Sequence, residues 1–178
     1  PVLEILDALS PAHARGVIHR DLKPANLLMC SPWDPRPGLK LTDFGIAYAV
    51  DQQVESGDLD EIAGTLHYMA PEQLYGRWRE YGPWTDLYAL GCLAWNLATG
   101  TVPFHGLGRQ ELLRAQVRED PPDFEPRTRV PAGFAAWRRR LMAKPAAARF
   151  ECAADATWTL SRLPEATPRG TVPPLPDD

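Results

Sequence analysis

The chain has 178 residues, of which 44% are hydrophobic and 24% charged, values that are typical of a folded globular domain. Its 19 basic and 23 acidic side chains leave a net charge of −4, which argues against a general binder of nucleic acids or anionic membranes. The spacing of Cys30, Cys92 and Cys152 excludes a disulfide framework and a C-x-x-C zinc site. We therefore expect free thiols in a cytoplasmic protein.

The first expected element is a helix that ends near Arg15, because apolar residues recur on one face and Gly16 suits a C-terminal stop. Two short strands follow, at residues 27–29 and 39–42. Three prolines within residues 31–38 exclude regular structure between them, so a small β-hairpin with a long tip is predicted. Residues 45–72 carry acidic side chains but no lysine or arginine, a pattern typical of a mobile acidic loop.

The rest of the chain is predicted to be helical. Thr85 suits the N-cap of a helix from Asp86 to Thr99, which is apolar on nearly every side and should be central. The uncharged run that contains this helix is interrupted by polar residues and proline, so a buried helix is favoured over a membrane span. Further helices are expected at residues 109–118, after Pro131 and at 153–163, followed by a proline-rich tail. We expect residues 137–140, which include three arginines, to form a solvated helix face.

Three short motifs occur in order between residues 19 and 72. They are H-R-D-L-K-P-A-N at residues 19–26, D-F-G at 43–45 and A-P-E at 70–72. A single D-F-G is weak evidence of function, because any strand end can carry it. All three motifs in this order and spacing strongly resemble those of eukaryotic-type protein kinases, a resemblance that implies phosphoryl-transfer chemistry.

That chemistry explains why these residue types are needed. Catalysis of phosphoryl transfer is mainly positioning and neutralisation of charge, and Mg²⁺ prefers oxygen ligands. Asn26 and Asp43, each at a strand end, are suited to hold Mg²⁺. Asp21 is suited to accept or orient the proton of a substrate hydroxyl, and Lys23 to balance the charge of the migrating phosphoryl group. Taken singly, each would be a turn residue, a cap or a solvated charge.

On these motifs the chain resembles a eukaryotic-type (Hanks-type) serine/threonine protein kinase, most closely the bacterial members. Lys23, two residues after Asp21, and the Gly64-Thr65 pair resemble the serine/threonine branch. The resemblance implies a mainly α fold over residues 1–163, the helical bundle of the kinase C-lobe, in which a small β-hairpin carries the catalytic and metal-binding loops. It further implies ATP and Mg²⁺ as cofactors, and transfer of the γ-phosphate of ATP to serine or threonine of protein substrates. Residues 164–178 are expected to be a proline-rich linker.

The resemblance also implies roles for individual residues. Those with catalytic roles are Asp21, Lys23, Asn26, Asp43 and Thr65. Those at the nucleotide are Leu28, Lys23, Asn26 and Asp43, with Leu27, Leu28 and Met29 as an apolar floor under adenine and Asn26 and Asp43 at the metal. Structural roles are implied for His19 and Phe44 in a stacked hydrophobic column, for Asp86 on the backbone of the catalytic loop, and for a Glu72–Arg149 pair.

Arg20 is implied to bind a phosphate on the activation loop. We hypothesise that Ser56 carries this phosphate, since it lies in the acidic loop; a permanent charge from Asp58, Asp60 or Glu61 is the alternative.

The sequence also departs from the family. Neither a G-x-G-x-x-G loop nor a V-A-I-K lysine occurs, so we expect that the small lobe lies outside this chain and that the chain alone transfers phosphate negligibly. Lys144-Pro145 stands where the family often has Asp-Pro. The expected partners are a protein substrate, the missing lobe and further domains of the same polypeptide, with no nucleic acid and no membrane segment in this chain.

Two alternatives to an active protein kinase stay open. One is a non-catalytic, kinase-like docking module, against which the presence of Asp21, Asn26 and Asp43 argues. The other is a small-molecule phosphotransferase, which the A-P-E and Gly64-Thr65 motifs disfavour.

Overall fold

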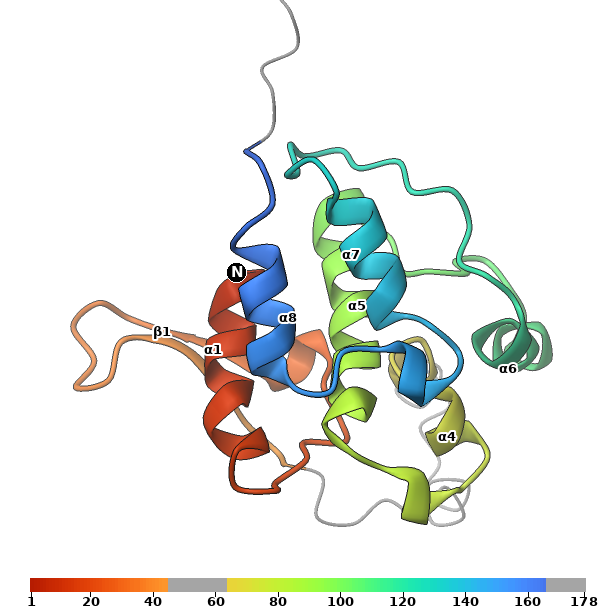
Figure 1. Cartoon of the computed structure of the whole chain (residues 1–178), viewed down its shortest axis with the longest axis horizontal. Helices are drawn as coiled ribbons and strands as arrows, with labels where there is room; N and C mark the ends of the chain where they lie inside the picture. The colour runs from red at the N-terminus through yellow and green to blue at the C-terminus, as the bar shows by residue number, and fades with distance from the viewer. Residues whose placement is uncertain (45–63, 166–178) are drawn as a thin grey trace, which may run out of the picture.

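A computed structural model describes residues 1–44 and 64–165 of the chain (Figure 1). The α-helices in this part are α1 (Val2–His13), α4 (Pro71–Leu74), α5 (Pro83–Thr99), α6 (Arg109–Arg118), α7 (Phe134–Leu141) and α8 (Ala153–Leu160). Short 3-10 turns are η1 (Pro24–Asn26), η2 (Trp78–Glu80) and η3 (Ala146–Ala148). Strands β1 (Leu27–Cys30) and β2 (Gly38–Leu41) form one antiparallel hairpin. The mainly α fold with a small β-hairpin is therefore confirmed.

Helix α5 forms the centre of the fold. It lies between the α1–α8 pair on one side and α4 and α6 on the other, and α7 packs against it (Figure 1). Leu87, Leu90 and Leu93 of α5 are at most 1% exposed, and its polar Asp86 is buried as well. A helix that is apolar on all sides is stable only when its neighbours enclose it, as they do here.

Helix α5 begins three residues before the predicted start. Pro83 occupies the first helical position, where its missing N–H is not needed, and Gly82 is the N-cap. Thr85 is not the N-cap; its Oγ1 accepts a hydrogen bond from the Gly82 N–H at 3.2 Å. The prediction identified the capping side chain but misplaced it, because a side chain three positions into a helix can reach back to the cap.

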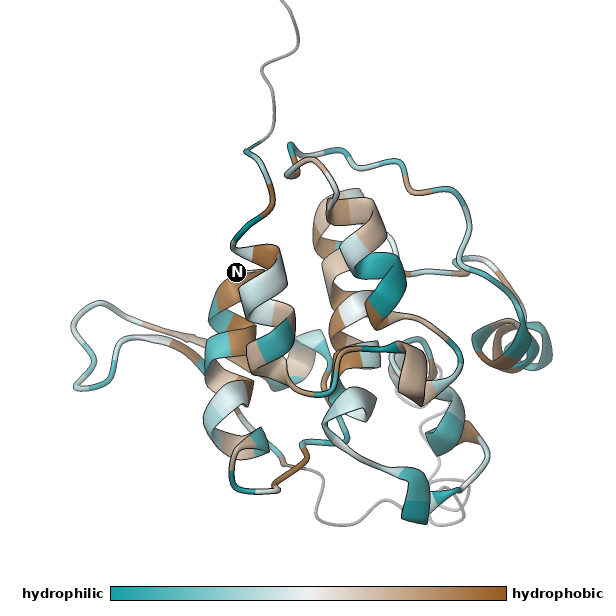
Figure 2. Cartoon of the chain, in the orientation of Figure 1, coloured by the Kyte–Doolittle hydropathy of each residue, from teal (hydrophilic) through white to brown (hydrophobic). Residues whose placement is uncertain are grey.

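The hairpin carries the segments that the motifs single out. Leu27 pairs with Leu41 and Cys30 with Gly38, and β2 packs against α1. The strands are hydrophobic, whereas their connecting loop is hydrophilic (Figure 2). Beyond the strands, the Thr42 N–H donates to the Asn26 carbonyl at 3.0 Å, which fixes the residues just before β1 beside those just after β2.

Arg138 on α7 corrects one prediction. Its side chain is 1% exposed and its guanidinium lies 4.3 Å from the Trp95 ring centroid and 4.6 Å from that of Phe124. The expected solvated face therefore holds for the exposed Arg139 and Arg140 but is wrong for Arg138 and for Trp137, which is 3% exposed. A planar, weakly hydrated guanidinium can stack on aromatic rings that come from distant parts of the chain, and a local pattern does not reveal those rings.

Other expectations have simple outcomes. All three cysteines are free, as predicted, and α1 and α8 end two to three residues before their predicted ends. None of the helices in the described ranges is long and apolar enough to cross a membrane. Ser56 and its acidic neighbours lie outside the described residues, as do residues 166–178 of the expected linker.

Candidate active site

Asp86, near the start of α5, holds the backbone of the 19–26 loop. Its Oδ2 accepts from the His19 N–H and its Oδ1 from the Arg20 N–H, both at 2.8 Å, so the contact expected for Asp86 is present. His13 Nε2 lies 2.9 Å from the same carboxylate. Arg20 has a left-handed φ of 70°, and its carbonyl accepts from Gln73 Nε2 at 2.7 Å. Bonds on both sides of Arg20 thus fix an unfavourable backbone conformation.

Asp21 lies at the centre of a polar network. Its Oδ2 accepts from Asn26 Nδ2 at 3.0 Å and is 3.2 Å from Lys23 Nζ, which in turn donates to Thr65 Oγ1 at 3.1 Å. Asn26 Nδ2 also donates to the Asp21 main-chain carbonyl at 2.7 Å. The Asp21 and Lys23 side chains are each 16% exposed. The four predicted residues are therefore brought together, with a carboxylate and an ammonium that are held in place yet still reach solvent.

Asn26 and Asp43 fit a magnesium site by the chemistry of their oxygens. Asn26 uses its Nδ2 on Asp21, which leaves its side-chain Oδ1 without a hydrogen bond within the described part of the chain. Asp43 is exposed, has φ 53° and makes no hydrogen bond or ion pair there. The Thr42–Asn26 backbone bond sets these two residues at the same end of the hairpin. No group of three or more His, Cys, Asp or Glu that could hold a metal occurs among residues 1–44 and 64–165. An oxygen pair that leaves room for waters suits Mg²⁺.

His19 and Phe44 are in contact, as expected for a stacked column. Their ring centroids are 4.5 Å apart, and His19 is fully buried. His19 Nδ1 accepts from the Asp21 N–H at 3.3 Å, so its proton is on Nε2, which donates to the Thr42 carbonyl at 2.9 Å. A neutral histidine therefore joins the loop of Asp21 to the segment that leads into Asp43.

Leu28 is the only one of the three apolar β1 residues that stays a candidate for the adenine floor. Successive strand residues face opposite sides, so Leu27 and Met29 cannot share a face with Leu28. Leu27 packs against the main core, whereas Leu28 is 49% exposed. The expected floor of all three residues is therefore narrowed to Leu28.

Glu72 and Arg149 form the expected pair, deep in the protein. Arg149 Nη1 and Nη2 donate to Glu72 Oε1 and Oε2 at 2.8 and 3.0 Å, and the two residues are 2% and 4% exposed. Thr85 Oγ1 also donates to Glu72 Oε1, at 2.9 Å. This pair joins α4 to the start of α5 and to the segment after η3. It therefore stabilises the elements that hold the 19–26 loop.

Two residues that hold the loop were missed at the level of sequence. Gln73 on α4 bonds the Arg20 carbonyl, and His13 on α1 bonds Asp86. Gln73 directly follows the A-P-E motif, and His13 lies six residues before His19, so both are close in sequence to one of the three motifs. Neither partner could be assigned, because the contacts join residues 53 and 73 positions apart.

Comparisons with known proteins agree with this geometry. Residues 2–147 match the protein kinase domain family. The chain is 43% identical over 120 residues to serine/threonine-protein kinase Pkn1 of Myxococcus xanthus, covering 67% of this chain and 17% of that protein. It is 39% identical over 119 residues to serine/threonine-protein kinase PknA of Mycobacterium tuberculosis, covering 67% and 26%. With probable serine/threonine-protein kinase PknB of Corynebacterium glutamicum the identity is 32% over 170 residues, covering 91% and 25%.

These matches cover most of this chain but only a small part of each relative. The chain spans only 17 to 26% of the length of these three proteins. The family match nevertheless covers most of the chain, including the Asp21 network, the hairpin and the Glu72 side of the buried pair. The chain belongs to the protein kinase domain family, in its bacterial-type serine/threonine branch.

Proposed function

We propose that this chain is the C-lobe, the part that carries the catalytic loop, of an enzyme that transfers the γ-phosphate of ATP to serine or threonine hydroxyls of protein substrates. The observation that supports the proposal best is the network of Asp21, Lys23, Asn26 and Thr65 on a loop that Asp86 fixes. A site that works by positioning needs such pre-set groups before substrate arrives.

In this proposal Asp21 accepts the proton of the attacking hydroxyl. The carboxylate is near enough to the surface to meet a substrate, and Asn26 restricts its rotation. Lys23 places its ammonium beside Asp21 and offsets the negative charge of the migrating phosphoryl group. Thr65 keeps the lysine in that position from the opposite segment.

Asn26 and Asp43 would hold magnesium through their side-chain oxygens. When bound, Mg²⁺ neutralises charge on the ATP phosphates and orients them for transfer. Asp43 offers a carboxylate free of other partners in the described residues, and Asn26 offers the amide oxygen that Asp21 does not use. Leu28 supplies an exposed apolar side chain on the hairpin for the adenine ring.

Arg20 is the proposed regulatory cation. Its side chain is exposed and its backbone is fixed by Asp86 and Gln73, so an activation-loop phosphate could pair with it without moving the loop. The proposal includes Ser56 as the residue that carries this phosphate and a protein as the substrate. It also includes further parts of the same polypeptide and a cytoplasmic location.

The test is transfer of labelled phosphate from Mg·ATP to a generic basic protein by the full-length gene product that contains this chain. Asp21→Asn keeps the size of the side chain but cannot take a proton, so we expect kcat to fall about 10²- to 10⁴-fold. Asp7→Asn is the matched control, since Asp7 is exposed on α1, and it should leave the rate unchanged.

The identity of the labelled residue is the second readout. Label on serine or threonine that disappears in Asp21→Asn would support the proposal. Equal transfer by wild type and Asp21→Asn would exclude Asp21 as the base. No transfer by either would instead favour a kinase-like docking module.

A further inference from the structure

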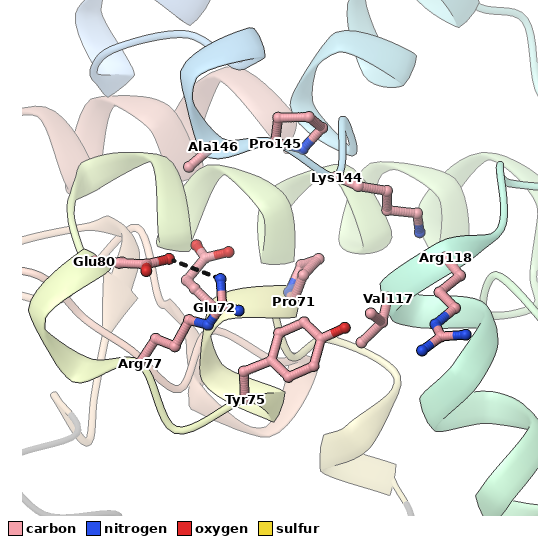
Figure 3. A pocket seen from close by; sticks show the side chains of 10 residues that line it. All are labelled: Pro71, Glu72, Tyr75, Arg77, Glu80, Val117, Arg118, Lys144, Pro145 and Ala146. Carbon is pink, nitrogen blue, oxygen red and sulfur yellow. Dashed lines mark ion pairs between the residues drawn. The ribbon is translucent and has the colours of Figure 1, made fainter.

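A cavity of about 230 Å³ lies between α4, α6 and the segment that joins α7 to α8 (Figure 3). Pro71 and Tyr75 come from the α4 side, and Val117 and Arg118 from the last turn of α6. Lys144 and Pro145 form the third wall. The cavity therefore joins elements that are far apart in the chain, and none of the proposed catalytic residues lines it.

Its carboxylates are already neutralised. Glu72 forms its two bonds with Arg149, and Glu80 is paired with Arg77 at 3.6 Å. Arg118 lines the cavity as well, and it has no ion pair within the described part of the chain. The cavity wall thus has an unbalanced positive charge, in a chain whose net charge is −4.

Lys144 adds a second, fixed positive charge. Its Nζ donates to the carbonyls of Ala115 and Gln116 at 3.2 and 2.9 Å and to the Tyr88 hydroxyl at 3.2 Å. All three acceptors are neutral, so the ammonium ties the end of α6 to α5 without losing its charge. Burial lowers the pKa of Lys144 to about 8, which means that a nearby carboxylate would stabilise its charged form. The exposed Asp120 and Glu119 act on it only at longer range.

The other walls are apolar and partly open. Proline rings and the Val117 side chain line them, and the Tyr75 side chain, 52% exposed, lies across the cavity from Pro145 (Figure 3). The volume is below the roughly 300–1,000 Å³ of small-molecule sites, so one side chain fits better than a complete cofactor.

We propose that this cavity docks an acidic peptide segment of a protein partner, with one bulky apolar side chain in the cavity, a flanking carboxylate paired with Arg118 and another within reach of the charge of Lys144. Charge complementarity selects this occupant, because the unpaired charges are positive and the walls are apolar. The site lies on α4, whose Gln73 also holds the Arg20 carbonyl, so a docked partner would be retained beside the catalytic loop. Binding requires no nucleotide and is independent of the catalytic proposal.

The test is binding of a fluorescein-labelled six-residue peptide, five acidic residues around one phenylalanine, to the full-length gene product that contains this chain, without ATP. Fluorescence anisotropy at low salt gives Kd for wild type, Arg118→Glu and Arg109→Glu. We expect Arg118→Glu to weaken binding about tenfold or more, because it places a like charge at the carboxylates. Arg109→Glu makes the same charge change on the exposed first residue of α6, outside the cavity, and should change Kd less than about twofold.

Two further peptides separate the contributions. Replacing the acidic residues by their amides should abolish binding, and replacing phenylalanine by alanine should weaken it several-fold. Circular dichroism of both variants should match wild type, since Arg109 and Arg118 are exposed. Absence of peptide binding by wild type would overturn the proposal. Equal weakening by Arg118→Glu and Arg109→Glu would overturn it too, since it would indicate attraction to net charge alone.

Discussion

Arg149 and Arg138 are both buried, but they are stabilised differently: Arg149 is paired with a carboxylate, whereas Arg138 contacts aromatic rings. Arg149 uses all five of its N–H groups: two on the Glu72 carboxylate and three on the carbonyls of Ala143, Lys144 and Trp84. Arg138 has no carboxylate partner in the described residues. It lies against two aromatic rings that also contact each other, donates from Nη1 to the Met142 sulfur at 3.1 Å, and leaves its Nε without a partner.

This difference determines how much each buried arginine contributes to the stability of the fold. A saturated ion pair is costly to break from one side, because the remaining charge stays buried and uncompensated. A buried cation without a counter-ion already bears part of that cost, which cation–π contacts only partly offset. Burial accordingly lowers the pKa of Arg138 to about 10. We expect Arg149 to be structurally essential and Arg138 to be replaceable.

The largest effect should follow Glu72→Ala, which removes the counter-ion of Arg149. We expect a loss of about 3–5 kcal/mol in the free energy of unfolding, because Arg149 would remain buried with two unpaired N–H groups. Urea denaturation of the chain measures it. Glu80→Ala is the control, since Glu80 is exposed and its pair with Arg77 spans 3.6 Å; it should cost less than about 0.5 kcal/mol. Equal costs for the two variants would show that burial of the pair does not matter.

The same comparison explains what the sequence could predict. The Glu72–Arg149 pair and the Asp86 contact were accessible because the resemblance to protein kinases, carried by the three motifs, implies both of them. Helical periodicity and the prolines of the hairpin loop predicted the individual elements, and the resemblance to protein kinases implied the fold that they form. The environment of Arg138 was not accessible, because Trp95 and Phe124 belong to other segments and no local pattern names them. The cavity is likewise formed by three segments that meet only in the folded chain.

Lys144 is a third cation, half-buried, and it gives a pH test of intermediate size. Its pKa is lowered to about 8 from the ordinary value of 10.5, so between these pH values the unfolded chain binds more protons than the folded one. The free energy of unfolding should therefore rise with pH across this window. Since Lys144 is only half-buried, solvent screening limits the gain to about 1 kcal/mol.

Lys144→Met isolates this contribution from those of tyrosines and cysteines that titrate at similar pH. Urea denaturation of both proteins at pH 8 and pH 10.5 gives the difference. Wild type should gain about 1 kcal/mol relative to Lys144→Met over this range. A constant difference would mean that the three hydrogen bonds to neutral oxygens fully replace the lost hydration of the ammonium.

The smallest effect should follow Arg138→Met, which removes the charge and keeps most of the apolar volume against the two rings. The variant loses two cation–π contacts, worth about 2 kcal/mol when desolvated. It gains a similar amount, because it no longer has a buried Nε without a hydrogen bond or a buried charge without its hydration. We therefore expect a change within about 1 kcal/mol by urea denaturation. Arg149→Met, the matched change, should cost about 3–5 kcal/mol because it leaves Glu72 buried without its partner. A loss above 3 kcal/mol in Arg138→Met would show instead that contact with the Trp95 and Phe124 rings stabilises a buried guanidinium as well as a carboxylate does.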